Sequence, residues 1–381
     1  MTKKLLILIF SSVLFACTPT QKVTSDMPVK AMSNPVGKQP AKPAKNIILL
    51  IGDGMGLTQT TAGMYANGNK TELEKFEFIG LHKSHASDNL ITDSAAGATA
   101  FASGIKTYNG AIGVDDNKSS VVTILEEAEA KGMATGLVAT STIVHATPAS
   151  FIAHNESRKN YEAIAADFLK TEVDLFIGGG KKFFERREDE RNLTAELEQK
   201  GYVVTDFIAS DLLNLNIDIS KNFACYTSEE QPLPVAQGRD YLPAVTKQSI
   251  EYLNARAGDN GFFLMVEGSQ IDWGGHANKA DYIISEFIDF DKALMEAVDF
   301  AIKDGNTLVV VTADHETGGF AIQNSSTMDS LVTAFTSDYH TATMIPVYAL
   351  GPHAKDFAGI YENTDIYFKM KKAFGWPKES K

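Results

Sequence analysis

Cysteine is nearly absent from this chain of 381 residues, which contains only Cys17 and Cys225. The scarcity excludes a disulfide framework of the kind that stabilises small secreted domains. If Cys17 is removed or modified, no intrachain disulfide can form. Stability must then come from a packed core and from bound groups such as metal ions.

The chain also has fewer basic residues than acidic residues. The chain has 35 Lys and Arg residues against 48 Asp and Glu residues, a formal net charge of −13. No basic stripe is available to neutralise a phosphate backbone, so nucleic acid is excluded as a specific partner. A small phosphorylated molecule is not excluded, because divalent cations can make one pocket of an acidic protein locally positive.

The apolar run at the start of the chain is too short to span a bilayer. It covers residues 5–15 and follows Lys3 and Lys4, whereas a spanning helix needs about 20 apolar residues. The pattern predicts a secretion signal over residues 1–17. Residues 14–17 are similar to a bacterial lipoprotein cleavage box, with Phe15 unusual in it, so either a lipid anchor on Cys17 or a plain secretory signal is expected. The protein is therefore predicted to be exported, and to be periplasmic or lipid-anchored on the periplasmic side of a bacterial membrane.

The rest of the chain predicts one large domain behind a linker. Residues 18–44 are rich in Lys, Pro, Ser and Thr without a hydrophobic period, which predicts a disordered linker. Over residues 45–381, strand-like and helix-like segments alternate, which predicts an α/β fold, a three-layer α/β/α sandwich with a large, mostly parallel central sheet. The more polar stretch 181–241 is expected to form a smaller insert beside the sheet or part of a dimer surface. Helices are expected at 119–131, 161–170, 191–200 and 280–304, and strands at 134–139 and 175–177.

Three apolar runs stop at side chains that can bind metal ions. Residues 45–52 end at Asp53, residues 261–266 end at Glu267, and residues 307–313 end at Asp314 and His315. Such runs predict buried parallel strands, and ligands of these sheets bind beyond the carboxyl ends of the strands. Carboxylates and imidazoles without thiolates favour zinc and magnesium. A metal-dependent enzyme is therefore the first hypothesis, although Asp53 taken alone is as well explained by a turn or a helix cap.

The glycine-rich segment 267–276 is the most specific part of the sequence. Asp272 and His276 are four residues apart, so a helical turn aligns them on one ion. Trp273 between them is placed to stack over a pocket. His340 precedes the apolar run 345–350 and is a candidate for a further nitrogen ligand, although a single histidine is more often structural.

Ser94 stands where a nucleophile is expected. Asp93 is a suitable N-cap for the alanine-rich helix predicted after it. Ser94 then lies in the first helical turn, where free backbone N–H groups favour an anion. Free serine is a poor nucleophile, and with no histidine nearby in the sequence a metal ion is the expected activator. The alternative is a helix of small residues that packs closely against the sheet.

Two further candidates follow the predicted strand 134–139. The Thr147 hydroxyl suits a hard cation. The forked guanidinium of Arg158 suits two phosphate oxygens, with a surface salt bridge as the ordinary alternative.

Taken together, these segments resemble the alkaline phosphatase family, in the family's order, from about residue 45 onward. The matching motifs are Asp93-Ser94-Ala95 for the nucleophile, residues 267–276 and Asp314-His315 for two metal blocks, and His340 as the last histidine. The pair His145 and Trp273 is most similar to cold-active and marine bacterial members. Enterobacterial members carry aspartate and lysine at these two positions.

The resemblance implies two zinc ions, one magnesium ion and a homodimer. The implied ligands are Asp272, His276 and His340 for one zinc, Asp53, Asp314 and His315 for the other, and Asp53, Thr147 and Glu267 for magnesium. Ser94 is the implied nucleophile and Arg158 the implied phosphate clamp. His145 either helps to bind magnesium or favours zinc at the third site.

The function implied is hydrolysis of phosphate monoesters with broad specificity, through a phosphoserine intermediate. One rival is a phosphodiesterase or phosphomutase of the same superfamily, although these normally lack the Asp93-Ser94-Ala95 helix start and the Arg158 clamp. The other is an exported protein that binds metal or phosphate without catalysis, which needs no nucleophile at a helix start. Rates on a monoester and a diester separate the three.

Overall fold

The computed structural model describes residues 42–377, which belong to one compact unit. The predicted signal at 1–17 and nearly all of the linker at 18–44 lie outside the described residues. No helix within residues 42–377 has the length and hydropathy needed to cross a membrane.

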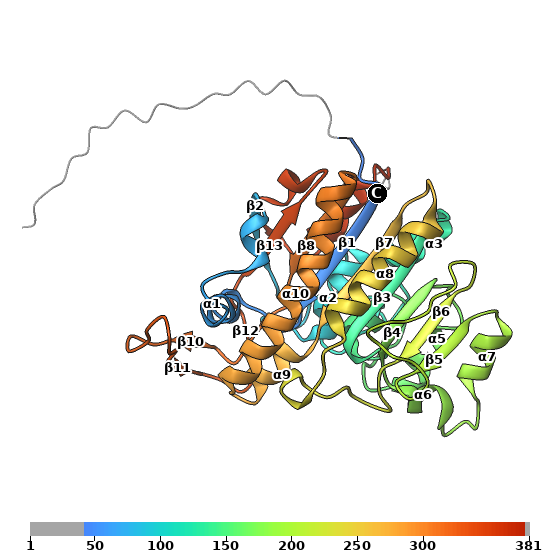
Figure 1. The fold of residues 1–381 in the computed structure, drawn as a ribbon, viewed down its shortest axis with the longest axis horizontal. Coiled ribbons are helices and arrows are strands. Elements are labelled where there is room, and N and C mark those ends of the chain that lie inside the picture. The colour runs from blue at the N-terminus through green and yellow to red at the C-terminus, as the bar shows by residue number, and fades with distance from the viewer. Residues whose placement is uncertain (1–41, 378–381) are drawn as a thin grey trace, which may run out of the picture. The chain divides into compact units, whose positions relative to one another are not determined.

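A ten-stranded sheet forms the centre of the molecule (Figure 1). The strand order is β14-β2-β13-β8-β1-β7-β3-β4-β6-β5. Every pairing in this sheet is parallel except those of β13, which runs antiparallel to both β2 and β8. The predicted mostly parallel sheet is therefore confirmed. Its strands are β1 (Asn46–Gly52), β2 (Phe78–Lys83), β3 (Ala134–Thr142), β4 (Leu175–Gly179), β5 (Val203–Asp206), β6 (Phe223–Tyr226), β7 (Phe262–Gly268), β8 (Thr307–Thr312), β13 (Ile345–Leu350) and β14 (Gly359–Glu362).

Two short ribbons lie outside the large sheet. One pairs β9 (Glu316–Thr317) with β12 (His340–Thr341), and the other pairs β10 (Ala321–Ile322) with β11 (Thr333–Ala334). Both pairs are antiparallel. The first ribbon joins the segment after β8 to the segment that carries His340.

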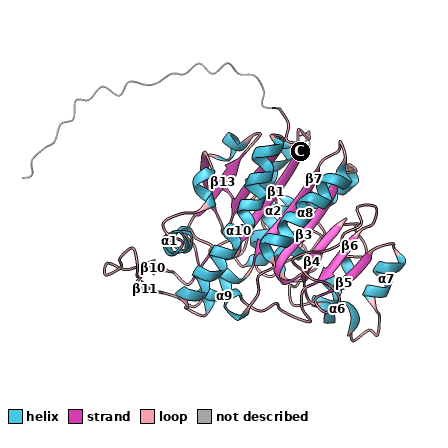
Figure 2. Ribbon diagram, in the orientation of Figure 1, coloured by secondary structure: helices cyan, strands magenta, loops and turns pink. Residues whose placement is uncertain are grey.

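Helices cover both faces of the sheet (Figure 2). Successive β1 side chains alternate between two cores, because neighbouring residues of a strand point to opposite faces. Ile47 and Leu49 lie in one core, and Ile48 and Leu50 lie in the other. One core is completed mainly by α2, α3, α5 and α11, and the other by α8 and α10, which cross in front of the sheet in Figure 1. The three-layer α/β/α sandwich is confirmed.

Helices connect most of the successive strands of the large sheet. The α-helices are α1 (Leu57–Ala66), α2 (Ser94–Ser103), α3 (Ile124–Ala130), α4 (Ala146–Ala149), α5 (Tyr161–Asp167), α6 (Lys181–Glu185), α7 (Leu193–Gln199), α8 (Leu242–Ala257), α9 (Gln270–His276), α10 (Ala280–Asp304) and α11 (Asp365–Ala373). The 3-10 helices are η1 (Glu72–Lys75), η2 (Val235–Gln237) and η3 (Ala354–Phe357).

The helix α10 has the bounds predicted from its hydrophobic period, whereas α3 begins five residues later than expected. Thr123 and Glu126 form a capping box, in which each side chain accepts a hydrogen bond from the backbone N–H of the other. This reciprocal cap fixes the first turn. Ser120 before it instead forms an isolated bridge with Val114.

The polar stretch 181–241 contributes directly to the sheet. It contains β5 and β6, and β5 is an edge strand of the ten. These strands stand away from the central four, β8, β1, β7 and β3, so the stretch extends the scaffold without supplying predicted site residues.

Candidate active site

The register of the central strands brings distant carboxylates to one level. Ile51 of β1 is paired with Thr312 of β8 on one side and with Glu267 of β7 on the other. Asp53 and Asp314 each lie two residues beyond the paired Ile51 and Thr312. Parallel strands end at the same edge of the sheet, so three carboxylates from remote parts of the chain meet there.

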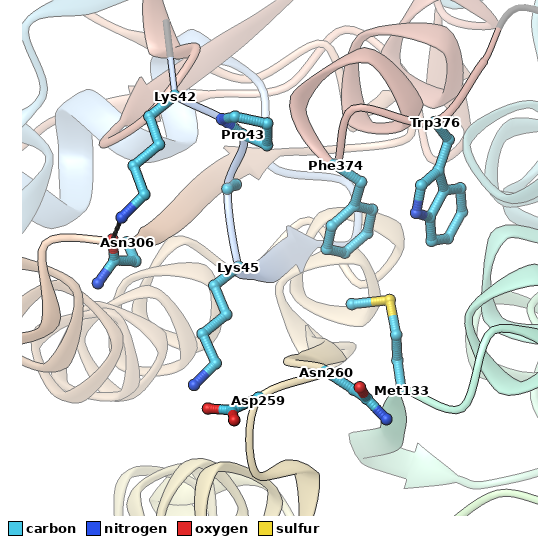
Figure 3. A pocket seen from close by; sticks show the side chains of 10 residues that line it. Lys42, Pro43, Lys45, Met133, Asp259, Asn260, Asn306, Phe374 and Trp376 are labelled. Atoms are coloured by element: carbon cyan, nitrogen blue, oxygen red, sulfur yellow. Dashed lines mark hydrogen bonds between the residues drawn. The ribbon is translucent and has the colours of Figure 1, made fainter.

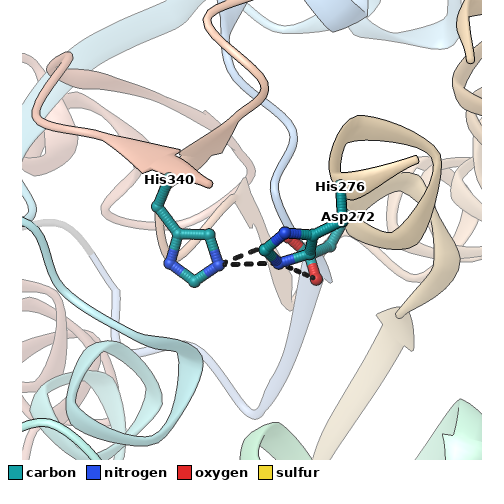
Figure 4. A group of neighbouring side chains, drawn as sticks. All are labelled: Asp272, His276 and His340. Atoms are coloured by element: carbon teal, nitrogen blue, oxygen red, sulfur yellow. Dashed lines mark hydrogen bonds and ion pairs between the residues drawn. The ribbon is translucent and has the colours of Figure 1, made fainter. Parts of the chain in front are cut away.

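Asp272, His276 and His340 form a first group of possible metal ligands (Figure 4). The helix α9 presents Asp272 and His276 one turn apart, while His340 arrives from β12. His276 Nε2 lies 3.4 Å from Asp272 Oδ2, and His340 Nε2 lies 3.6 Å from Asp272 Oδ1. The three side chains therefore converge on a common point. Spacing predicted this for Asp272 and His276, and the resemblance implied it for His340.

The two histidines of this group are held by backbone carbonyls. His276 Nδ1 lies 2.7 Å from the carbonyl oxygen of Asp338, and His340 Nδ1 lies 2.8 Å from that of Thr92. A carbonyl only accepts, so each Nδ1 carries the hydrogen and each Nε2 keeps its lone pair. The two Nε2 atoms are 3.1 Å apart. Two facing lone pairs repel each other, and a cation between them removes the repulsion.

A second group consists of Asp53, Asp272 and His315. His315 Nε2 lies 3.5 Å from Asp53 Oδ1, 3.2 Å from Asp314 Oδ2 and 3.3 Å from Ser94 Oγ. Both Asp53 carboxylate oxygens are buried and accept no hydrogen bond from residues 42–377. Buried, unpartnered carboxylate oxygens are costly, so a bound cation is the partner that they fit.

A third group consists of Asp53, His145 and Glu267. Ser269 donates a hydrogen bond to Glu267 Oε2 at 2.6 Å, and Thr147 lies fully buried beside this group. Burial lowers the pKa of His145 to about 3, so its imidazole is neutral and can offer a lone pair. This group combines His145 with Asp53 and Glu267, two of the three residues that the resemblance implies as magnesium ligands.

Burial and mutual repulsion raise the pKa values of three carboxyl groups in this site. Burial, followed by the charges of Asp314, Asp272 and Glu267, raises the pKa of Asp53 well above its usual range. Burial is also the main cause that raises the pKa values of Glu267 and Asp314, each to about 7. Divalent cations reverse both effects, because each brings two positive charges into direct contact with the ligands. The donor set therefore fits metal ions of the kind expected from the sequence.

Ser94 opens α2 as predicted, beside Arg158. Asp93 Oδ1 accepts a hydrogen bond from the N–H of Ala96 at 3.0 Å and so caps the helix. Asp93 Oδ2 accepts another at 2.9 Å from Nη1 of Arg158. One carboxylate thus positions both the serine helix and the guanidinium.

These groups surround a hollow of about 370 Å³. It is lined by Asp93, Ser94, His145, Arg158, Asp272, Trp273, His276, Tyr339 and His340. The serine, the guanidinium and the first group of ligands share this one space. It is large enough for a phosphate group and part of its substituent.

All the residues predicted for the site lie in or around this hollow. They are Asp53, Ser94, His145, Thr147, Arg158, Glu267, Asp272, Trp273, His276, Asp314, His315 and His340. The four histidines expected to be structural make contacts elsewhere: His82 with Ala313, His85 with Glu362, His154 with Glu126 and His353 with Asp356.

Sequence reasoning missed three contributions. Thr317 contacts both Asp272 and His315, Tyr339 lies in the wall of the hollow, and Asp93 pairs with Arg158. The first two stand beside predicted ligands, yet hydroxyl and aromatic residues near a ligand carry no distinctive sequence signal. The Asp93 contact spans 65 positions of the chain.

A different hollow, of about 470 Å³, lies at the amino ends of the central strands (Figure 3). It is lined by Lys42, Pro43, Ala44, Lys45, Met133, Asp259, Asn260, Asn306, Phe374 and Trp376. Several of these residues directly precede β1, β3, β7 and β8. Since Asp53, Glu267 and Asp314 lie at the carboxyl ends of β1, β7 and β8, this hollow belongs to the opposite end of the sheet and takes no part in the site.

Comparison with known proteins gives consistent matches. The family model "Alkaline phosphatase" matches residues 44–334. Alkaline phosphatase 3 of Bacillus subtilis is 39% identical over 97% of this chain and 80% of its own length, and alkaline phosphatase of Escherichia coli is 33% identical over 88% and 87%. The structure of alkaline phosphatase from the Antarctic bacterium TAB5 is 43% identical, with a TM-score of 0.82, over 89% of this chain and 100% of that one. A cold-active alkaline phosphatase from a psychrophilic Shewanella is 31% identical, with a TM-score of 0.78, over 87% and 100%.

Proposed function

The chain belongs to the alkaline phosphatase family and is a phosphate monoester hydrolase, and we propose that it works through a phosphoserine formed on Ser94, with two zinc ions and one magnesium ion bound around it. One observation carries the proposal. Ser94 Oγ lies 3.3 Å from His315 Nε2, in the same hollow as Arg158 and the Asp272–His276–His340 group. A hydroxyl in the first turn of α2 is thus placed against an anion site and two groups of metal ligands.

The three ligand groups support bound metal ions, and the family resemblance supplies the division of the ligands among the ions. One zinc is assigned to Asp272, His276 and His340, the second to Asp53, Asp314 and His315, and magnesium to Asp53, Thr147 and Glu267 with His145 beside them. A TAB5 variant in which aspartate replaces a histidine has magnesium bound in a site named M3, so a protein of this fold can hold magnesium. When bound, the ions supply positive charge to the Ser94 oxygen and to the leaving oxygen, and they lower the pKa of the attacking water.

Ser94 carries the chemistry in two steps. Ser94 Oγ gives its proton to solvent and attacks phosphorus in line, and the bond from phosphorus to the ester oxygen breaks as the new P–O bond forms. The alcohol leaves with the electron pair of the broken bond and takes up a proton from solvent. Water then loses a proton and attacks phosphorus from the vacated side, the bond from phosphorus to Ser94 Oγ breaks, and Ser94 Oγ takes up a proton as inorganic phosphate is released.

Arg158 orients the phosphoryl group during both steps. Its guanidinium is held through Nη1 by Asp93, and Nη2 lies 3.4 Å from Nε2 of His145. The other N–H groups are offered to the non-bridging oxygens. These contacts recognise phosphate rather than its substituent, which accounts for broad specificity.

Replacement of Ser94 by alanine tests the proposal directly. The S94A variant should lose nearly all turnover of a generic monoester while it retains the zinc and magnesium content of the wild-type protein. Acid quenching of the wild-type enzyme with ³²P-labelled substrate should place the label on the peptide that contains Ser94. Full activity in S94A, or label on a different peptide, contradicts the assignment of the nucleophile.

Assembly and location are further parts of the proposal. The family resemblance supports a homodimer, which the mass in solution tests. The leader at 1–17 supports export, with a lipid on Cys17 or a plain secretory cleavage, and mass spectrometry of the amino-terminal peptide distinguishes the two.

A further inference from the structure

Tyr339 ends a stack of three aromatic rings that runs from the surface into the site. The rings of Tyr339 and His340 are nearly parallel, with centroids 4.4 Å apart and an angle of 7°. The ring of His340 is stacked in turn on that of His315, at 3.5 Å and 16°. The exposed fraction falls along the stack, from 47% at Tyr339 to 5% at His340 and 0% at His315. The tyrosine is therefore the solvent-facing end of a stack that is anchored among the metal ligands.

The position of Tyr339 matters because of the direction of the reaction. In an in-line displacement the leaving oxygen lies opposite the attacking oxygen. Ser94 Oγ approaches from the side of His315, so the leaving oxygen lies on the other side, towards His276 and His340. Tyr339 covers that side of the hollow, with its ring 5.9 Å from the ring of His276 and stacked on His340.

We propose that Tyr339 provides a stacking surface for a planar aromatic leaving group, so that aromatic phosphate monoesters are preferred over aliphatic ones. The inference rests on the proposed function, because the direction of attack from Ser94 decides which wall the leaving group meets. A half-exposed ring held by a parallel partner offers a large apolar surface at little cost in side-chain entropy. The aromatic group is either bonded directly to the ester oxygen, as in an aryl phosphate, or carried at a distance, as in a nucleotide.

The lining of the hollow places Tyr339 near the groups that bind phosphate, because Asp93, Arg158 and Tyr339 all belong to it. Trp273, from α9, lies elsewhere in the lining, with its ring edge-on to His145 at 6.2 Å. Trp273 therefore belongs to the side of the third ligand group, and the leaving-group side is left to Tyr339.

Matched substrates test the preference in the metal-loaded enzyme. Phenyl phosphate and cyclohexyl phosphate form one pair, with equal carbon numbers but one planar and one puckered ring. AMP and ribose 5-phosphate form the other, with and without a base. The ratio of kcat/KM within each pair is compared between the wild-type enzyme and its variants, so intrinsic differences in leaving-group reactivity cancel.

Three variants distinguish two roles of Tyr339: stacking against the substrate, and only supporting the ring of His340. Y339L keeps an apolar side chain without a ring, and Y339F keeps the ring without the hydroxyl. F207L is the matched control, since Phe207 is 37% exposed and follows the edge strand β5, away from the hollow. Y339L is expected to lower the phenyl-to-cyclohexyl ratio by about three- to tenfold, the range of an aromatic pair. Y339F and F207L are expected to keep the ratio of the wild-type enzyme.

Inhibitor binding gives a readout that does not depend on chemistry. Phenylphosphonate should lose affinity in Y339L by a similar factor, and cyclohexylphosphonate should not. A fall in the AMP-to-ribose ratio as well identifies nucleotides as part of the preferred class, whereas a fall in the phenyl pair alone identifies aryl esters. Unchanged ratios, or an equal loss for all four substrates with a loss of metal, overturn the stacking role while the phosphatase assignment stands. A wild-type enzyme that hydrolyses none of the four overturns the proposed function itself.

Discussion

The hydroxyl group of Thr317 donates a hydrogen bond to Asp272 Oδ1, and the same oxygen lies 3.2 Å from Nδ1 of His315. A hydroxyl has one hydrogen, so it donates to the carboxylate and accepts from the imidazole N–H. This arrangement turns the Nε2 lone pair of His315 towards Ser94. One buried side chain therefore orients ligands that belong to two different metal groups.

Replacement of Thr317 by valine should loosen both of those groups. Valine has a similar shape but leaves Asp272 and His315 without their shared partner. Loss of such an outer contact typically lowers metal affinity by about 10- to 100-fold. Zinc content measured after dialysis against graded chelator concentrations checks the expectation. T61V is the control, because the Thr61 hydroxyl bonds only the Leu57 carbonyl of its own helix; zinc retention equal in the two variants would speak against the linking role.

Replacement of Arg158 by lysine should weaken phosphate recognition although it keeps the charge. A lysine cannot hold Asp93 and two phosphate oxygens at the same time, because its donors lack the planar fork of a guanidinium. The loss of one charge-assisted hydrogen bond corresponds to a fall of about 10- to 100-fold in kcat/KM for a generic monoester. The inhibition constant of inorganic phosphate should rise in parallel.

R186K is the matched control for this variant. Arg186 pairs with Glu229 at the surface, with 67% of its side chain exposed. It should behave as the wild-type enzyme in both measurements. An R158K variant with unaltered phosphate inhibition removes the clamp from the mechanism.

Removal of metal ions should abolish activity and lower thermal stability together. Without cations, the buried carboxyl groups of Asp53, Glu267 and Asp314 lie close together, and burial and their mutual charges raise their pKa values. Ions that bind only the folded state stabilise it, so their loss should lower the melting temperature. EDTA treatment followed by assays with zinc, with magnesium and with both checks this, and full recovery is expected only with both. Persistent turnover in a protein shown by elemental analysis to be metal-free contradicts the metal assignment.

Glu129 should make the protein less stable at alkaline pH. Burial raises the pKa of its side chain, on α3, from 4.5 to about 8, with the charges of Asp174 and Glu172 adding to the rise. Between these two pH values the folded state holds a proton that the unfolded state has released, so stability falls as the pH rises. Below about 4.5 both states are protonated, and this contribution to stability is fully present.

The E129Q variant removes this titration. Its melting temperature should exceed that of the wild-type protein at pH 9, and the advantage should shrink at pH 5.5. E251Q is the control, because Glu251 is exposed on α8. A stability difference between E129Q and wild type that is the same at both pH values rules out the protonation of Glu129 as its cause.

Local patterns of the sequence determined the elements and the chemical character of the site. Buried apolar runs predicted β1, β7 and β8, and a regular hydrophobic period predicted α10 with its observed bounds. The prediction that Asp93 is an N-cap placed Ser94 in the first turn of a helix, and α2 has this arrangement. These features depend on interactions over a few residues, where the strand period, the helix period and capping act directly.

Only the tertiary structure decided which side chains meet. The resemblance implied Asp272 as a ligand of one zinc ion only, whereas the fold places Asp272 in two groups of possible ligands. It also brought the ring of Tyr339 to within 5.9 Å of the ring of His276, and Asp93 against Arg158. These contacts join segments far apart in the chain, and their geometry follows from strand register and loop packing. No local pattern encodes that geometry, because the same hydroxyl, ring or carboxylate is equally suited to solvent until the sheet aligns the segments that carry it.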